Sequence, residues 1–350
     1  MAKSLAVRDF RLDTIKTVMI LGIVVEHSIL IYGYPRSHEL VWAILISWLM
    51  PMFTLISGYL YKQRNLKELL SKYIYPMLLF SAVNFAIGYL FYDKYHEGIN
   101  IIGYAMWYLW ALFWFQIITP PILRIFNIKV LLVISFVAAV IYSLLPISGM
   151  PAMLANKLQI NRLVGFYPFY LLGILLKTNG LLATKRMNSW RLTGLIVMAL
   201  YLGCCYLVGG FAYKSGFYLS TSSSVVMVAQ ILSSYVFIMA ICVCLIKAIP
   251  NSENRISIYG GRTLNVYLLH MIVVFPICYG VFKHLDYSLL NVVLNSLLAC
   301  LLCLTFFTKK CDMIMKRLIG KQHWGVVVAL YLMTLVLVNS TIITKFLFNG

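Results

Sequence analysis

The strongest constraint on the fold is a series of long apolar stretches. A membrane core of about 30 Å takes about 20 helical residues to cross, and eleven stretches approach that length. They are residues 14–33, 40–61, 73–92, 101–122, 130–146, 163–177, 192–210, 225–248, 263–283, 289–308 and 324–345. Two of them, 130–146 and 163–177, are short for a span. We expect an all-α polytopic integral membrane bundle of ten to eleven transmembrane helices, forming one domain over residues 1–350.

The composition points the same way. Hydrophobic residues make up 62% of the 350 residues and charged residues only 11%, whereas soluble domains carry about 25% charged residues. The N-terminal segment MAKSLAVRDFRLD leads into the first stretch without a small-residue cleavage site, so we expect the first span to be retained.

The charged residues are distributed unevenly between the two sides of the membrane. If the N-terminus is cytoplasmic, 22 of the 29 Lys and Arg residues fall in inner segments and seven in outer ones. The basic segment 309–321 is one of these inner connections. The positive-inside rule therefore predicts a multi-pass protein of the cell (plasma) membrane with a cytoplasmic N-terminus. It also explains the net charge of +19 without nucleic acid, although some of these cations could bind an anionic ligand.

Cysteine spacing does not predict a metal site. The eight cysteines lie in or beside apolar stretches, and the CxxC formed by Cys300 and Cys303 has no second such pair or histidine nearby. We therefore expect no metal.

Two ionisable residues, Glu26 and His27, lie inside the first stretch. Lys16 and His27 are eleven residues apart, which is about three helical turns and about 16 Å, so they share a helix face. Ionisable groups within a span are costly, and histidine suits proton transfer near neutral pH. His27 is thus a candidate base, with a packing hydrogen bond as the alternative. Glu26 points about 100° away and could orient His27, pair with a basic residue of another helix or face a water-filled cavity.

The residues around this stretch resemble membrane acyltransferase family 3, in particular its sugar O-acetylase branch. The opening RLDTIKTVMILGIVVEH resembles the family pattern of an Asp, a basic residue three positions later and a His after ten more residues, here Asp13, Lys16 and His27. Five later segments resemble family motifs in the same order: MPMFTLISGYLYK (50–62), LLSKYIYPMLLF (69–80), MWYLWALFWFQ (106–116), NRLVGFYPFYLLGILLK (161–177) and GRTLNVYLLHMIV (261–273). The family core would span about 11–308, with 324–345 as an extra C-terminal helix. This chain has Leu49 where the O-acetylase branch commonly has a histidine.

The resemblance implies an acyl-CoA-dependent membrane O-acyltransferase. It would move an acetyl or succinyl group from cytoplasmic acyl-CoA, acetyl-CoA first, to a hydroxyl of an extracytoplasmic glycan or lipid-linked sugar. His27 would be the general base, with Glu26 beside it. The donor site would involve Lys16, Arg11, Asp13, Lys72 and Arg262, and the acceptor site Arg162, Trp107, Tyr267 and His270. Most of these residues have an alternative interpretation. The cations could simply follow the positive-inside rule, Arg162 and Trp107 could anchor the chain at the membrane interface, and His270 could form a hydrogen bond that packs helices together.

Two other functions would suit a basic, aromatic-rich, polytopic chain. One is a transporter or flippase of lipid-linked sugars, and the other is a non-catalytic scaffold of a polysaccharide export complex. The Asp13, Lys16 and His27 frame favours the enzyme, because a flippase has no evident use for it. The expected partners are the glycan acceptor and membrane lipids, and either a second copy of the chain or cell-envelope polysaccharide machinery.

Overall fold

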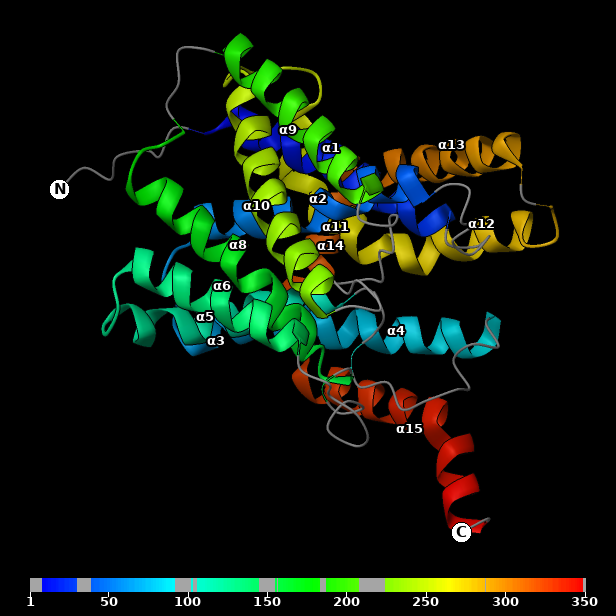
Figure 1. Ribbon diagram of the computed structural model, residues 1–350. Coiled ribbons are helices and arrows are strands. Elements are labelled where there is room, and N and C mark those ends of the chain that lie inside the picture. The colour runs from blue at the N-terminus through cyan, green and yellow to red at the C-terminus, as the bar shows by residue number, and fades with distance from the viewer. Residues whose placement is uncertain are drawn as a thin grey trace.

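The computed structural model describes residues 8–29, 39–91, 102, 106–144, 155, 157–182, 187–207, 224–286 and 288–348 (Figure 1). Every regular element in these ranges is a helix. The elements are α1 (Phe10–Ile29), α2 (Glu39–Tyr59), α3 (Leu66–Leu69), η3 (Leu70–Ile74), α4 (Tyr75–Phe91), α5 (Trp107–Leu123), α6 (Ile128–Leu144), α8 (Ile160–Thr178), α9 (Met187–Leu207), α10 (Ser224–Ala248), η5 (Ser257–Arg262), α11 (Thr263–Leu269), η6 (His270–Val274), α12 (Phe275–Phe282), α13 (Leu289–Phe306), α14 (Lys309–Gly320) and α15 (Trp324–Phe348).

Each of the eleven apolar stretches contains a helix, so the all-α class is confirmed. The short stretches 130–146 and 163–177 form α6 and α8, and the C-terminal stretch 324–345 forms α15. Residues 30–33, 92, 101 and 208–210, which the sequence places at outer ends of spans, lie outside the described residues.

The chain is a membrane protein, but the described helices do not confirm ten to eleven spans. Four of them are long and apolar enough to cross a membrane, or five if the pair α14 and α15, bent by 96°, counts as one. Three of the other helices fall short of the criteria for a span for clear reasons: α5 and α6 have only 17 residues each, and α1 carries four charged residues, Arg11, Asp13, Lys16 and Glu26.

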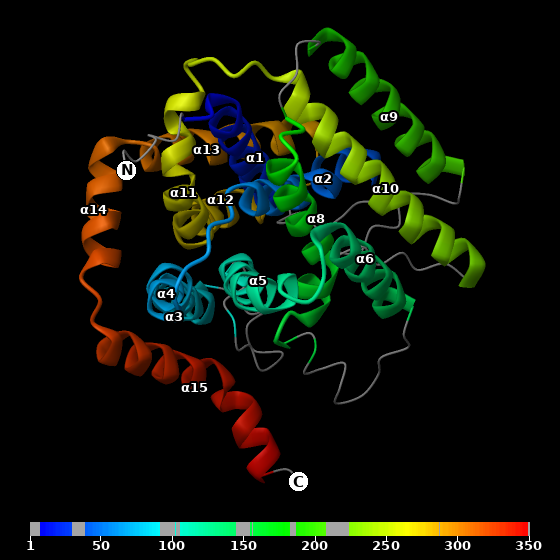
Figure 2. The same ribbon diagram turned by 90° about the vertical axis from the view of Figure 1, so that its left-hand side faces the viewer.

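Helix α1 lies in the middle of the bundle. It packs against η5, α13, α2 and α11, and Figure 2 shows α13, α2 and α11 beside it. Its buried apolar side chains include Met19, Ile20, Ile23 and Val24, each exposed by 3% or less. A helix in this position presents its polar residues to other helices, which is where intramembrane ionisable groups are normally found.

Helices α2 and α8 approach each other closely through two glycines. A Cβ atom added to Gly58 would collide with the carbonyl oxygen of Tyr170, and one added to Gly173 would collide with the carbonyl oxygen of Leu55. Small residues permit such contact between membrane helices. This contact fixes α8, which carries Arg162, against α2.

Two helices contain a short π-helical turn. The turn η3 separates α3 from α4, and the turn η6 separates α11 from α12. Such turns are rare and occur frequently at functional sites. Lys72 and Tyr73 lie in η3, and His270 begins η6.

The basic segment 309–321, expected from the sequence to connect two spans, contains the helix α14 (Lys309–Gly320), which lies between α13 and α15. Its apolar residues recur with helical spacing, although its many charges suggest a loop. The next helix, α15, packs on α4, with the rings of Phe85 and Tyr331 6.1 Å apart.

Candidate active site

A cavity of about 260 Å³ lies between α1, α2, η3, α5 and α11. Its lining side chains are Lys16, Ile20, Ile23, Met50, Phe53, Ser57, Leu60, Arg64, Lys72, Tyr73, Tyr108, Leu109, Leu112, Gln116, Thr263, Leu264 and Tyr267. Most of this lining is apolar. The polar groups fall into a set of cations near the start of α1 and a set of hydroxyl and amide groups farther in.

Three cations mark one end of the cavity. Lys16 lies near the start of α1, Arg64 follows the end of α2, and Lys72 lies in the turn before α4. Arg64 and Lys72 are close enough to repel each other electrostatically. Like charges held together in this way provide a strong positive potential for a polyanion. Lys16 and Lys72 belong to the donor site expected from the sequence. Arg64 does not, because nothing in the sequence distinguishes Arg64 from the other cations in predicted inner loops.

One face of α1 leads from this end into the protein. Lys16, Ile20 and Ile23 all line the cavity, and His27 lies one further turn along the same face. The α1 face that the spacing of Lys16 and His27 predicts therefore faces the cavity at Lys16, Ile20 and Ile23. His27 itself lies beyond the lining, next to His270 of η6: the two imidazole centroids are 5.2 Å apart and the ring planes differ by 24°.

His270 has a defined tautomer. Its Nδ1 donates hydrogen bonds to the carbonyl oxygens of Tyr267 at 2.8 Å and Val266 at 3.1 Å, because a carbonyl oxygen can only accept. The proton therefore resides on Nδ1, and Nε2 carries a lone pair. Among the described residues this Nε2 atom is buried without a hydrogen-bond partner. A buried acceptor of this kind is a place where a hydroxyl or water can bind.

Two tyrosines connect the histidines to the cavity. The ring of Tyr267 lies 6.1 Å from that of His270 and 5.9 Å from that of Tyr108. The Tyr108 hydroxyl donates to the carbonyl oxygen of Phe53 at 2.9 Å and lies 2.8 Å from the Ser57 hydroxyl. Both tyrosines line the cavity. Ring contacts through Tyr267 and His270 thus connect the cavity lining to His27.

Arg162 of α8 reaches the same region from another direction. Its guanidinium carbon lies 4.5 Å from the centroid of Trp107, and it is close enough to Glu26, His27 and Tyr267 to interact with each electrostatically. Gln159, just before α8, has a left-handed backbone with φ of 56°. Such a conformation is uncommon for a residue with a side chain. It sets the turn from which Arg162 enters the site.

The structure therefore brings together six of the residues named from the sequence. They are Glu26, His27, Trp107, Arg162, Tyr267 and His270. Of the three options for Glu26, the neighbourhood of Arg162 matches the second, a basic partner on another helix. The indole of Trp107 contacts both Arg162 and the ring of Phe166, whose centroid is 5.2 Å away.

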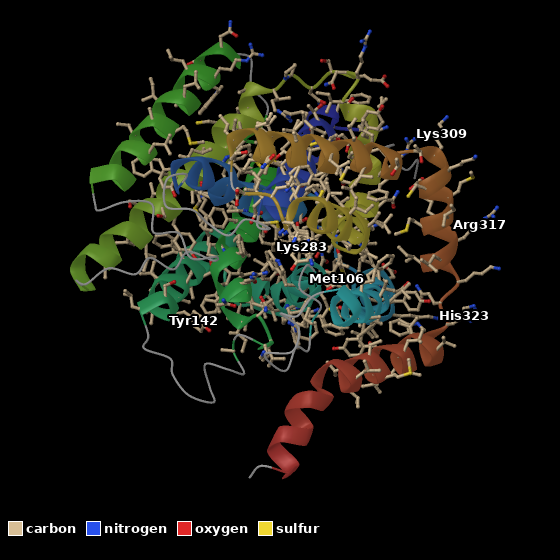
Figure 3. The ribbon with its side chains drawn as sticks, turned by 90° about the vertical axis from the view of Figure 1, so that its right-hand side faces the viewer. Met106, Tyr142, Lys283, Lys309, Arg317 and His323 are labelled. Atoms are coloured by element: carbon tan, nitrogen blue, oxygen red, sulfur yellow. The ribbon has the colours of Figure 1, made fainter. Side chains whose placement is uncertain are left out.

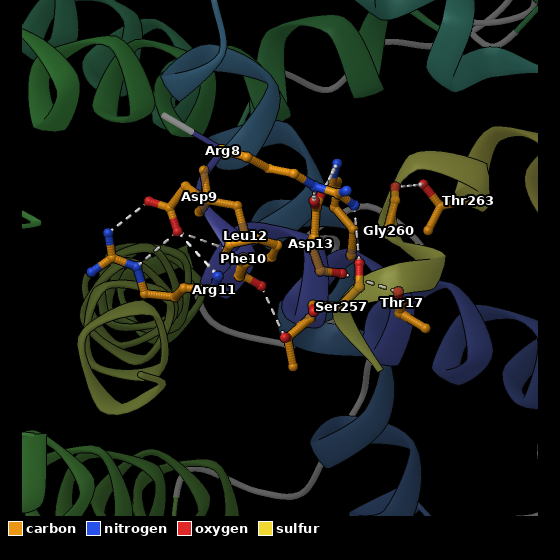
Figure 4. Close-up of polar contacts among 12 residues, drawn as sticks. Arg8, Asp9, Phe10, Arg11, Leu12, Asp13, Thr17, Ser257, Gly260 and Thr263 are labelled. Carbon is orange, nitrogen blue, oxygen red and sulfur yellow. Dashed lines mark hydrogen bonds and ion pairs between the residues drawn. The ribbon is translucent and has the colours of Figure 1, made fainter. Parts of the chain in front are cut away.

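Asp13 holds Lys16 rather than lining the cavity. Its carboxylate contacts Lys16 Nζ at 2.7 Å and Arg8 Nε at 2.6 Å, and Gly260 of η5 lies so close that a Cβ atom there would collide with Asp13. Figure 4 shows Arg8 extending past Asp13 toward η5. This clamp restrains the cation at the cavity entrance.

Two other residues named for the donor site lie outside the cavity lining. Arg11 is buried and binds Asp9 at 2.7 Å and the carbonyl oxygen of Leu182 at 2.8 Å; in Figure 4 it points away from Asp13. Arg262 donates to the carbonyl oxygen of Phe307 at 2.6 Å. Both side chains join helices in this structure, and a direct contact with the donor stays a prediction.

Leu49 stands where the sequence resemblance leads one to expect a histidine. It is 2% exposed and packs against Gly22 of α1, where a Cβ atom would lie 2.9 Å from Leu49 Cδ2. Leu49 is not part of the cavity lining. At this position the chain has apolar packing between α1 and α2.

Gln116 was also missed. It is 5% exposed and lines the cavity, and its Oε1 atom has no hydrogen-bond partner among the described residues. The sequence signal for Gln116 was that it is the single side-chain amide within the apolar stretch 101–122.

For metal binding, the described residues contain no group of three His, Cys, Asp or Glu side chains that could hold an ion.

These features define an all-helical membrane protein with a cavity that is lined by cations at one end and leads toward two stacked imidazoles. A comparison with family models identifies the class: the acyltransferase domain of membrane acyltransferase family 3 matches residues 9–308. The chain belongs to this family and is an acyltransferase. No match was found among curated proteins or among solved structures.

Proposed function

We propose that this protein transfers an acyl group, acetyl or succinyl, from cytoplasmic acyl-CoA to a hydroxyl of an extracytoplasmic glycan or lipid-linked sugar. In this proposal it is a cell-membrane protein of the O-acetylase branch with ten to eleven spans and a cytoplasmic N-terminus. The observation that carries the proposal is the cavity, which begins among Lys16, Arg64 and Lys72 and leads along α1 toward His27 and His270.

The donor would enter from the cationic end. CoA carries phosphate groups, which form charge-assisted hydrogen bonds with Lys and Arg. Its thioester lies at the end of a long, largely uncharged arm, which suits the apolar wall formed by Ile20, Ile23 and Leu109. Asp13 would act indirectly, by holding Lys16 at 2.7 Å. The thioester would then lie near Tyr108 and Tyr267.

The imidazole pair supplies the base. In the proposed step the acceptor hydroxyl oxygen attacks the thioester carbonyl carbon, a C–O bond forms, and the C–S bond breaks. His27 takes the hydroxyl proton and returns it to the departing thiolate. The stacked ring of His270, fixed by its two backbone hydrogen bonds, holds His27 in place.

Arg162 and Trp107 would serve the acceptor side. The guanidinium of Arg162 is positioned near Glu26 and His27, where a cation can stabilise the negative charge that develops on the carbonyl oxygen. Trp107 offers an aromatic face of the kind that packs against sugar rings, beside the same arginine.

The proposal is tested by comparing glycans from cells with and without the protein by mass spectrometry. An ester on a hydroxyl adds about 42 Da for acetyl and about 100 Da for succinyl. Membranes containing the protein should also transfer label from labelled acetyl-CoA to this glycan. Unchanged glycans together with no transfer from any acyl-CoA would contradict the proposal.

A further inference from the structure

Helix α14 has three distinct faces. Cys311, Met315 and Ile319 lie toward one side, and Met315 is 3% exposed. Next to this side is an exposed apolar strip of Ile314 and Leu318, which are 64% and 46% exposed. A third face carries the cations Lys310, Arg317 and Lys321, spaced seven and four residues apart so that they form one row.

The row of cations is available to a ligand. Lys310, Arg317 and Lys321 are exposed, and none of them makes an ion pair with another described residue. Figure 3 shows Arg317 extending outward from the edge of the molecule. The one acidic residue of the helix, Asp312, is already paired with Lys316 at 2.6 Å, and this hydrogen bond holds the pKa of Asp312 below its ordinary range. The other cations therefore lack a counter-charge on the helix.

Helix α14 lies at the end of the bundle that carries the cationic entrance. Its first turn is joined to α11, where Asn265 Nδ2 donates to Asp312 Oδ1 at 3.4 Å. Just after its last turn, the carbonyl oxygen of Lys321 accepts from the Tyr75 hydroxyl at 3.3 Å, and Gln322 donates to Ser71. Ser71 and Tyr75 flank Lys72 and Tyr73, which line the cavity. The helix runs along the edge of the molecule from α13 to α15 (Figures 2 and 3).

We propose that α14 is an interfacial helix that binds anionic phospholipid. The apolar strip of Ile314 and Leu318 would enter the acyl-chain region, and the adjacent row of Lys310, Arg317 and Lys321 would contact the phosphate groups. A basic face beside an exposed apolar face is the pattern of helices that lie in the membrane surface. The inference is separate from acyl transfer and uses the proposed orientation only to assign the cytoplasmic leaflet.

The test compares lipids retained by the purified full-length protein. The protein is incubated in mixed micelles with equimolar phosphatidylglycerol and phosphatidylcholine, and native mass spectrometry measures the retained lipid. The protein should retain mainly phosphatidylglycerol. Changing Lys310→Gln, Arg317→Gln and Lys321→Gln together should lower this preference by about fivefold per charge. A matched control changes three other exposed lysines, Lys62, Lys67 and Lys129, to Gln and should keep the preference.

A second variant tests the apolar strip. Ile314→Ser with Leu318→Ser should reduce retention of phosphatidylglycerol while leaving the three cations intact. Equal retention of the two lipids by the unmodified protein would overturn the proposal, as would equal loss in the control triple variant. Displacement of phosphatidylglycerol by an equal concentration of soluble glycerol phosphate would overturn the assignment to a lipid. None of these outcomes depends on acyltransferase activity.

Discussion

The imidazole rings of His27 and His270 stack 5.2 Å apart, although they come from the first helix and from the π-helical turn after α11. The His270 ring is held by two backbone carbonyl groups, so its position is set by its own helix. His27 packs against that ring. The two histidines therefore have different expected roles, one as the base and one as its support.

Substitution of the two histidines should separate these roles. His27→Ala should lower acyl transfer by roughly 10²- to 10⁴-fold, the usual contribution of a general base. His270→Gln removes the ring but retains a polar side chain, and it should lower transfer by a smaller factor, roughly 10-fold on the same scale. Transfer of labelled acyl groups in membranes with equal amounts of protein measures both. His284→Ala, at an exposed position, is the control and should be fully active. Normal transfer by His27→Ala would remove the base from the proposal.

Lys16 should act on the donor. Lys16→Gln removes a cation from the cavity entrance, and loss of a charge-assisted contact with phosphate should raise the KM for acyl-CoA by about 10-fold or more. The KM for the acceptor and the kcat should change little. Lys67→Gln removes an exposed cation from the neighbouring helix α3 without touching the lining, and it should leave the KM unchanged. Equal KM values for acyl-CoA in the two variants would mean that Lys16 follows the positive-inside rule and does not bind the donor.

Arg11 should behave differently from Lys16. Arg11 is 8% exposed, and its side chain binds both Asp9 and the carbonyl oxygen of Leu182. Arg11→Gln should therefore lower the free energy of unfolding by about 1.5–3 kcal/mol and lower the thermal unfolding temperature, with little change in the KM for acyl-CoA. A raised KM with unchanged thermal stability would instead support the direct role in donor binding predicted from the resemblance.

The glycine contact between α2 and α8 should tolerate no added atom. Gly58→Ala places a methyl group against the backbone of Tyr170, and such overpacking costs about 1–3 kcal/mol. Gly203→Ala in α9, where the added atom would meet nothing within 4 Å, is the matched control. Thermal unfolding in detergent should show a lower unfolding temperature for the Gly58 variant alone. A stable Gly58→Ala protein would mean that α2 and α8 can move apart.

Leu49 tests whether the family histidine can be restored. Leu49→His buries an imidazole against Gly22, in a position that does not line the cavity. An unsatisfied buried polar group costs about 1–3 kcal/mol, so this variant should unfold at a lower temperature without a gain in activity. Leu49→Met keeps an apolar side chain of similar volume and should be close to neutral. Increased transfer by Leu49→His would place that position at the acceptor.

Much of the fold was predictable because apolar stretches of span length leave few structures other than helices. Lys16 in the cavity lining and the stacked pair of His27 and His270 beyond it could also be named from the sequence, since Lys16 and His27 share a helix face and His270 is an ionisable residue in an apolar stretch. Arg64 was not, because a cation in an inner loop looks the same whether it lines a cavity or faces solvent. The clamp of Asp13 by Arg8 and Gly260 depends on contacts between distant segments. Helix α14 was missed because its charge suggested a connection, although its apolar residues recur with helical spacing.

The position of His27 relative to Lys16 is fixed by the backbone hydrogen bonds of one helix, α1, which contains both residues. The distance along α1 from Lys16 at the cationic entrance to the His27 imidazole is therefore fixed, and it does not change when the surrounding helices move. Each residue added between Ile20 and Ile23 would increase the distance from Lys16 to His27 by about 1.5 Å and rotate His27 about the helix axis by about 100°. A donor with a longer or shorter arm would therefore meet its base only if the register of α1 changed with it.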